Sequence, residues 1–139
     1  MAISKASAQW DGGLKDGKGL MKPAHGGEVG FTAGTRFEGV PGSNPEEMIG
    51  AALSGCFSMA LSAELGKAQA TPRSIRTSAD VRLEKTDAGF TITRIDLTCE
   101  AKVEGVDDAK FQKIAAATKK GCPVSRALSV EVHLTAKLV

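Results

Sequence analysis

The sequence NPEEMIGAALSGCFSMALSAELG, residues 44–66, carries the strongest local structural signal of the chain. It opens with the signals of a helix start, because Asn44 can cap the helix, Pro45 suits its first position and Glu47 can complete a capping box. From there to about Gly66 nearly every residue is apolar or small. The pattern predicts a helix that is apolar nearly all round, and therefore central and buried.

Small residues recur at every fourth position of this helix. Positions 50, 54, 58, 62 and 66 read Gly, Ser, Ser, Ser and Gly. A row of such residues lets another backbone approach closely. The core helix of a monomer could carry it, but a helix–helix seam between two subunits explains the row better.

Strand patterns lie on both sides of the helix. Before it, glycine-punctuated segments at 3–10, 18–22 and 29–38 predict three short strands. After it, residues 75–84 alternate, a turn follows at 87–89, and the return strand shifts its phase near Arg94, which indicates a β-bulge. A second helix is expected from Asp107 or Asp108, then a short helical turn after Cys122-Pro123 and a last strand at 130–139. The order βββ–α–ββ–α–β predicts an α+β fold.

Length and composition describe one ordinary domain over residues 1–139. The net charge is +2, and neither half of the chain has the run of Lys and Arg interleaved with aromatic residues that a nucleic-acid surface needs. The longest uncharged apolar stretch, residues 48–63, is shorter than the roughly 20 residues that a bilayer requires. The first residues lack the apolar core of a signal peptide. We therefore expect a cytoplasmic protein without membrane or nucleic-acid partners.

The three cysteines differ in their settings. Cys56 lies mid-helix among apolar neighbours, where a cysteine acting as a small hydrophobe is a sufficient explanation. Cys122 precedes Pro123 at a predicted helix N-terminus, where backbone N–H groups should favour the thiolate and lower the pKa. Cys99 falls on the apolar face of a strand and is interpreted as structural.

No metal or cofactor site is predicted. The cysteines and the two histidines, His25 and His133, lack the spacing of metal ligands. The sequence also contains neither a phosphate-binding glycine loop followed by Lys-Ser/Thr nor a serine-hydrolase elbow. Any redox chemistry would therefore belong to the thiols.

Four motifs together resemble the OsmC/Ohr family of thiol peroxidases, named for osmotic induction and organic hydroperoxide resistance. They are TRFEG at 35–39, NPEE at 44–47, GCFSMAL at 55–61 and GCPVSR at 121–126, in family-like order and spacing. The RFEG segment favours the osmotically inducible branch. The resemblance covers almost the whole chain and implies antiparallel sheets wrapped around central helices in an intertwined homodimer.

The resemblance also implies a role for four residues. Cys56 would be the peroxidatic thiolate and Cys122 the resolving thiol, so that a Cys56–Cys122 disulfide forms after the sulfenic acid. Arg36 would supply the cation beside Cys56, and Glu46 would hold Arg36. From the residues alone, Arg36 could equally be a surface charge and Glu46 a favourable acid in a first helical turn.

The spacing of Glu46 and Cys56 suggests how many chains build one site. Ten residues of helix span roughly 15 Å along the axis, farther than a glutamate side chain reaches. If both residues serve one site, either the helix is broken or Glu46 comes from another subunit. The row of small residues favours the second option, an intertwined homodimer with two sites at its interface.

The function expected from these features is the reduction of organic hydroperoxides, and less efficiently of hydrogen peroxide. A dithiol or a lipoylated protein would recycle the enzyme, with no haem, flavin or metal. A non-catalytic thiol redox sensor or stress-induced binding module on the same dimeric scaffold is the alternative. A purely structural dimer, whose cysteines only pack, is a third.

Overall fold

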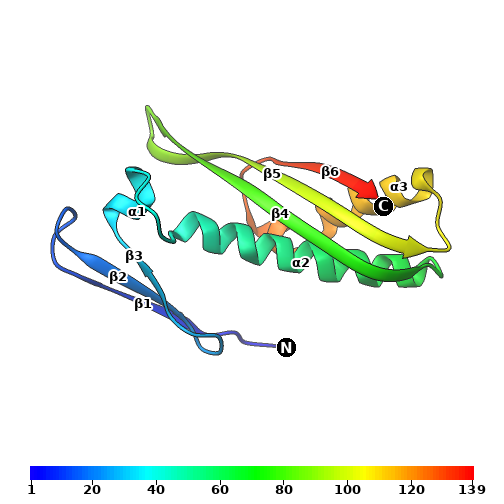
Figure 1. Ribbon diagram of the computed structural model, residues 1–139, viewed down its shortest axis with the longest axis horizontal. Coiled ribbons are helices and arrows are strands. Elements are labelled where there is room, and N and C mark those ends of the chain that lie inside the picture. Colours follow the sequence, from blue (N-terminus) through cyan, green and yellow to red (C-terminus); the bar gives the residue numbers. More distant parts are fainter. The chain divides into compact units, whose positions relative to one another are not determined.

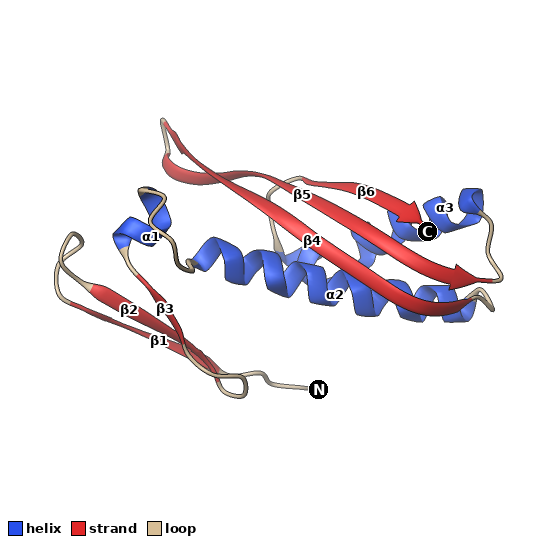
Figure 2. Ribbon diagram, in the orientation of Figure 1, coloured by secondary structure: helices blue, strands red, loops and turns tan.

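A computed structural model describes residues 1–139 and confirms the α+β class. In chain order the elements are β1 (Ala6–Asp11), β2 (Lys18–Pro23), β3 (Val29–Phe31), α1 (Ala33–Phe37), α2 (Pro45–Lys67), β4 (Thr71–Thr86), β5 (Gly89–Glu104), α3 (Asp108–Gly121), α4 (Pro123–Ala127) and β6 (Val132–Leu138) (Figures 1 and 2). The chain divides into two compact units, residues 1–47 and residues 48–139. The single domain expected over residues 1–139 stays a prediction.

The N-terminal unit is a three-stranded antiparallel sheet, in the order β1-β2-β3, followed by α1. Two of its strands lie where the sequence predicts them. The third is shorter than predicted, because it ends at Phe31 and residues 33–37 are helical. The reason is local: the Thr32 hydroxyl accepts a hydrogen bond from the Thr35 N–H, and the Thr35 hydroxyl accepts one from the Thr32 N–H. This reciprocal capping starts a helix within a segment that otherwise resembles a strand.

One pair of aromatic rings packs over a glycine in the N-terminal unit. The rings of Trp10 and Phe31 lie 5.5 Å apart over Gly19, where a Cβ atom would come within 2.8 Å of both rings. All six residues of β1 are exposed, and no hydrophobic residue of residues 1–47 is fully buried. The unit therefore has no hydrophobic core of its own.

The C-terminal unit is built on the sheet β4-β5-β6. β4 and β5 form a long hairpin, and their register slips between Arg82 and Leu83, opposite Arg94 and Ile92, so that Thr93 is the extra residue. This slip confirms the β-bulge predicted near Arg94. β6 pairs with β5 in parallel. The expectation of antiparallel sheets is thus correct for the other strand pairs and wrong for β6, because α3 and α4 return the chain before its last strand begins.

The core of the C-terminal unit lies between this sheet and its helices. α2 begins as predicted, with the Asn44 side chain accepting from the Glu47 N–H at 2.9 Å. Figure 1 shows α2 running along the sheet. The buried hydrophobic residues of α2 recur at four-residue spacing and share one core cluster with alternate residues of β5 and the inner face of α3. From α2 they are Leu53, Phe57, Leu61 and Leu65, from β5 Ile95, Leu97, Cys99 and Ala101, and from α3 Phe111 and Ala115.

The row of small residues on α2 lies partly against the chain's own β4. A Cβ on Gly50 would meet Val81 at 3.2 Å, and the Ser58 hydroxyl lies 2.7 Å from that of Thr77. The interpretation of the whole row as a seam between subunits is therefore wrong at these two positions. Small residues are needed at these positions because β4 of the same unit lies close to α2 there.

A different face of α2 is left uncovered within one chain. Ala52, Gly55 and Ala63 are exposed, and Met59 is 75% exposed. The helix is consequently buried on one side only, not all round as predicted. By length and composition alone α2 could cross a membrane, but the core helix of a soluble protein meets the same criterion, and its buried face here packs in a protein core.

Candidate active site: a cysteine pair and an arginine–glutamate pair

The structure brings Cys56 and Cys122 together, although 66 residues separate them in the chain. The Cys122 thiol donates to the Cys56 sulfur, with the two Sγ atoms 2.9 Å apart and both residues free thiols. Cys56 lies on the middle of α2 and is half-buried, whereas Cys122 is only 1% exposed. The pair lies entirely within the C-terminal unit.

The junction of α3 and α4 positions Cys122. Its N–H donates to the Thr118 carbonyl at 2.8 Å and ends α3, while Pro123 begins α4 immediately afterwards. The Thr118 hydroxyl donates to the Ile114 carbonyl, so its buried oxygen is satisfied within α3. The end of α3 and the start of α4 therefore place the thiol against Cys56 of α2.

The protonation of Cys122 differs from the prediction. The backbone N–H groups of Ser125 and Val124 at the start of α4 do contact the sulfur and favour its thiolate, as expected. Burial nevertheless dominates and raises the pKa of the Cys122 thiol, and the hydrogen bond to Cys56 raises it further. The predicted lowering is wrong because a short helix cannot offset the removal of the thiol from water.

Arg36 and Glu46 form a second pair, within the N-terminal unit. The Arg36 Nη2 donates to Glu46 Oε1 at 2.7 Å, and its Nε donates to the two carboxylate oxygens at 3.1 and 3.3 Å. The Glu46 side chain is 7% exposed and that of Arg36 is 36% exposed. This charge-assisted, forked geometry fixes the guanidinium, and the pairing is the one implied by the resemblance.

Arg36 lies on a helix in a segment for which the sequence predicts a strand. Arg36 lies in the last turn of α1, which Thr32 and Thr35 cap, and the Asn44 side chain donates to the Thr35 carbonyl at 3.4 Å. The guanidinium also lies 5.2 Å from the centre of the Phe37 ring. Thr32 and Thr35 have the three-residue spacing of a capping box, which is the sequence feature that could have predicted this helix.

The helix between the two pairs is continuous. α2 runs unbroken from Pro45 to Lys67, so the option of a broken helix between Glu46 and Cys56 is wrong. At 1.5 Å per residue the two positions remain about 15 Å apart along the axis. A site that uses both residues requires them from two chains.

Cys99 is a member of neither pair. It is fully buried on β5 opposite Thr77, and burial raises the pKa of its thiol. It belongs to the hydrophobic core cluster, and its thiol also hydrogen-bonds with the Thr77 side chain. Its position fits the structural role expected of it.

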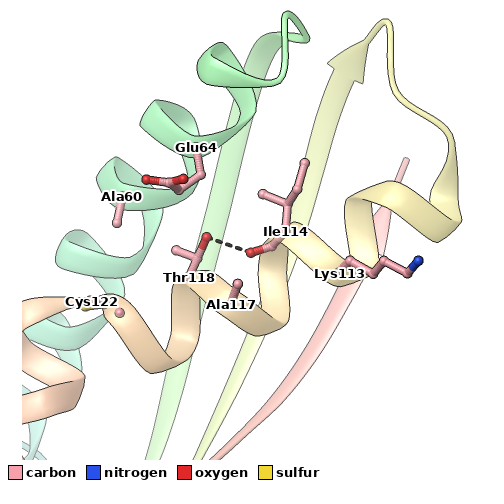
Figure 3. A pocket seen from close by; sticks show the side chains of 8 residues that line it. Ala60, Glu64, Lys113, Ile114, Ala117, Thr118 and Cys122 are labelled. Atoms are coloured by element: carbon pink, nitrogen blue, oxygen red, sulfur yellow. Dashed lines mark hydrogen bonds between the residues drawn. The ribbon is translucent and has the colours of Figure 1, made fainter.

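A cavity of about 370 Å³ has Cys122 in its lining (Figure 3). It lies between α2 and α3 and is lined by Ala60, Glu64, Lys113, Ala117, Thr118 and Cys122, among others. Most of this lining is apolar, and Glu64 and Lys113 are its charged residues.

The family of the chain follows from comparison with known proteins. The family model described as OsmC-like protein matches residues 37–137. The chain belongs to the OsmC-like family. Peroxiredoxin OsmC of Escherichia coli (strain K12) is 49% identical over 136 residues, which cover 96% of this chain and 95% of that protein. The Peroxiredoxin OsmC of Shigella flexneri matches to the same extent.

Solved structures of OsmC-like and Ohr proteins share the fold. The organic hydroperoxide resistance protein OhrB of Bacillus subtilis superposes with a TM-score of 0.72 at 24% identity, over 97% of this chain and 98% of that one. An OsmC-like protein from Mycoplasma pneumoniae gives a TM-score of 0.79 at 13% identity, over 99% and 98%. The family resemblance and the OsmC-like α+β fold expected from the sequence are thus confirmed.

Proposed function

We propose that this OsmC-like protein is a cysteine-based peroxidase that reduces organic hydroperoxides, and less efficiently hydrogen peroxide, to alcohols or water. Relatives named Peroxiredoxin OsmC at 49% identity over nearly the whole chain support the class of enzyme, a thiol peroxidase. The observation that carries the mechanism is the 2.9 Å contact between Cys56 and Cys122.

In the first step the Cys56 thiolate attacks the distal oxygen of the hydroperoxide. The O–O bond breaks, an alkoxide leaves and takes up a proton as the alcohol, and Cys56 becomes a sulfenic acid. Cys56 suits this role because it is the more exposed of the two thiols. The hydrogen bond from Cys122 favours an electron-rich sulfur on Cys56.

In the second step Cys122 attacks the sulfur of the sulfenic acid and expels water, which leaves a Cys56–Cys122 disulfide. The resolving thiol needs no rearrangement to reach its target, since the two sulfurs already touch. A dithiol then reduces the disulfide and restores both thiols. This use of a small or protein-bound dithiol belongs to the proposal, as does a cytoplasmic location that keeps thiols reduced.

Arg36 would stabilise the thiolate and the departing alkoxide, with Glu46 fixing its orientation. The forked pairing supports this role, because a guanidinium held at three contacts is pre-organised for an anion. α2 is continuous, so we assign Arg36 and Glu46 of one chain to the site built on Cys56 of a second copy. The uncovered face of α2 around Met59 supplies an apolar surface for such a dimer.

Turnover separates this proposal from the alternatives. The protein should consume cumene hydroperoxide catalytically with dithiothreitol as reductant. Cys56→Ser should abolish turnover, and Cys122→Ser should consume one equivalent of peroxide and then stall or over-oxidise. A redox sensor would react once per molecule, and a structural dimer would hardly react. Wild-type turnover by Cys56→Ser would contradict the mechanism.

A further inference from the structure

We propose that the cavity between α2 and α3 is the access route of the reductant, and that a small, flexible dithiol entering it attacks Cys122, not Cys56. The inference rests on the proposed disulfide and adds the sulfur that is attacked and the surface that admits the attacker. Hydroperoxide and reductant would then reach the cysteine pair from different sides.

The shape of the cavity supports this route. Cys122 belongs to the cavity lining, whereas Cys56 does not. Its volume of about 370 Å³ falls in the range of small-molecule sites. Cys122 is only 1% exposed, so a thiol that attacks it needs an opening, and this cavity includes Cys122 in its wall. Small side chains border the approach, among them Ala60 and Ala117 (Figure 3).

The charge at the cavity favours an attacking thiolate. Glu64 is paired with Lys67 at 2.6 Å, whereas Lys113 takes part in none of the ion pairs of the structure. An unpaired ammonium beside an apolar cavity attracts an anion and favours the ionised form of a nearby thiol. A dithiol with one ionised sulfur matches the apolar walls and the single free cation.

The chemistry of exchange favours attack at Cys122 as well. In thiol–disulfide exchange, the sulfur that leaves as the better-stabilised thiolate leaves faster. Attack at Cys56 would expel Cys122 as a thiolate, and burial raises the pKa of that thiol. Attack at Cys122 instead expels Cys56, which is half-buried and nearer to water.

The electrons and protons of the step balance. A thiolate of the dithiol bonds to Cys122 Sγ, the protein S–S bond breaks, and its electron pair goes to Cys56 Sγ, which is then protonated. The second thiol of the reductant attacks its own sulfur in the mixed disulfide and releases Cys122. The dithiol becomes a cyclic disulfide, and the protein regains two thiols.

The test measures the two half-reactions separately. Reduced protein is first treated with one equivalent of cumene hydroperoxide, and disulfide formation is followed by loss of free thiols. The purified disulfide form is then mixed with dithiothreitol in stopped flow. Ala117→Leu, which fills the cavity from an exposed helix position, should slow only the second reaction, by at least about tenfold. Ala116→Leu, the exposed neighbour outside the cavity, should stay within twofold of wild type.

A trapping experiment on the wild-type protein needs no variant. The disulfide form is pulsed with 2-mercaptoethanol, quenched with N-ethylmaleimide and digested for mass spectrometry. The mercaptoethanol adduct should lie on Cys122 and the maleimide on Cys56. An adduct on Cys56, or equal reduction rates for Ala117→Leu and Ala116→Leu, would overturn the access route. Failure of the wild type to form the disulfide would instead overturn the proposed function.

Discussion

The two compact units differ in what holds them together. The C-terminal unit contains every fully buried hydrophobic residue of the chain. The N-terminal unit, by contrast, carries seven of the ten large hydrophobic residues that are exposed. Three strands need a covered hydrophobic face to be stable. We infer from this difference that residues 1–47 depend on a surface beyond their own sheet, which the proposed second copy would supply.

The two pairs of the candidate active site also lie in different units. The two thiols belong to the unit with a core, where packing fixes their contact to each other. The charge pair Arg36–Glu46 belongs to the unit without one, where three hydrogen bonds fix it instead. An intertwined dimer would join the nucleophile of one chain to the cation of the other.

The largest expected effect concerns two leucines, one in each unit. Leu61→Ala should lower the free energy of unfolding by about 2–5 kcal/mol, because Leu61 is fully buried in the core. Leu20→Ala, at a residue that is 38% exposed in one chain, should cost less than about 1 kcal/mol in dilute protein. Urea unfolding measures both. If the loss of unfolding free energy in Leu20→Ala grows with protein concentration, residues 1–47 are stabilised by a second copy. A loss that is the same at every concentration would contradict that dependence.

The next effect tests the uncovered face of α2. Met59→Lys places a charge on a residue that is 75% exposed in one chain, so a monomer would tolerate it. In a dimer that buries this face, the unpaired charge should raise the dissociation constant by at least about a hundredfold. Light scattering after gel filtration reports the mass. Thr98→Lys, on the exposed face of β5, is the matched control and should leave the mass unchanged.

A smaller effect concerns the charge pair. Glu46→Gln keeps the size of the side chain but removes the charge that orients Arg36, so kcat/KM for cumene hydroperoxide should fall roughly ten- to hundredfold. Glu47→Gln, its exposed neighbour, should keep wild-type activity. Steady-state assays compare them, and circular dichroism checks that both variants fold. Equal activity of the two variants would remove the pair from the mechanism.

The smallest effect is a dependence of stability on pH. Burial raises the pKa of Cys99 and Cys122 in the folded state above its value in the unfolded chain. Their neutral forms are therefore favoured by folding, and this stabilisation is complete below the unfolded thiol pKa. It is lost as the pH rises through the folded pKa. The Tm should consequently fall on the alkaline side, and less steeply in Cys99→Val. An identical alkaline loss in that variant would contradict the contribution of Cys99.

Local signals in the sequence were sufficient for much of the fold, whereas the candidate site residues came from the resemblance to the OsmC/Ohr family. The Asn44 cap, the bulge at Thr93 and the start of α3 all follow from neighbouring residues, and the cysteine motifs pointed to the pair that meets. Strand direction and burial could not be predicted from neighbouring residues. Alternation gives no strand direction, so the parallel pairing of β6 was missed. The burial that decides the pKa of Cys122 comes from elements far away in the chain.

The most direct measurement is the mass and thiol content of the protein after one equivalent of cumene hydroperoxide. We expect loss of two free thiols, a disulfide-linked peptide pair that contains Cys56 and Cys122, and an unmodified Cys99. A stable sulfenic or sulfinic acid on Cys56 with Cys122 still free, or a disulfide that includes Cys99, would contradict this expectation.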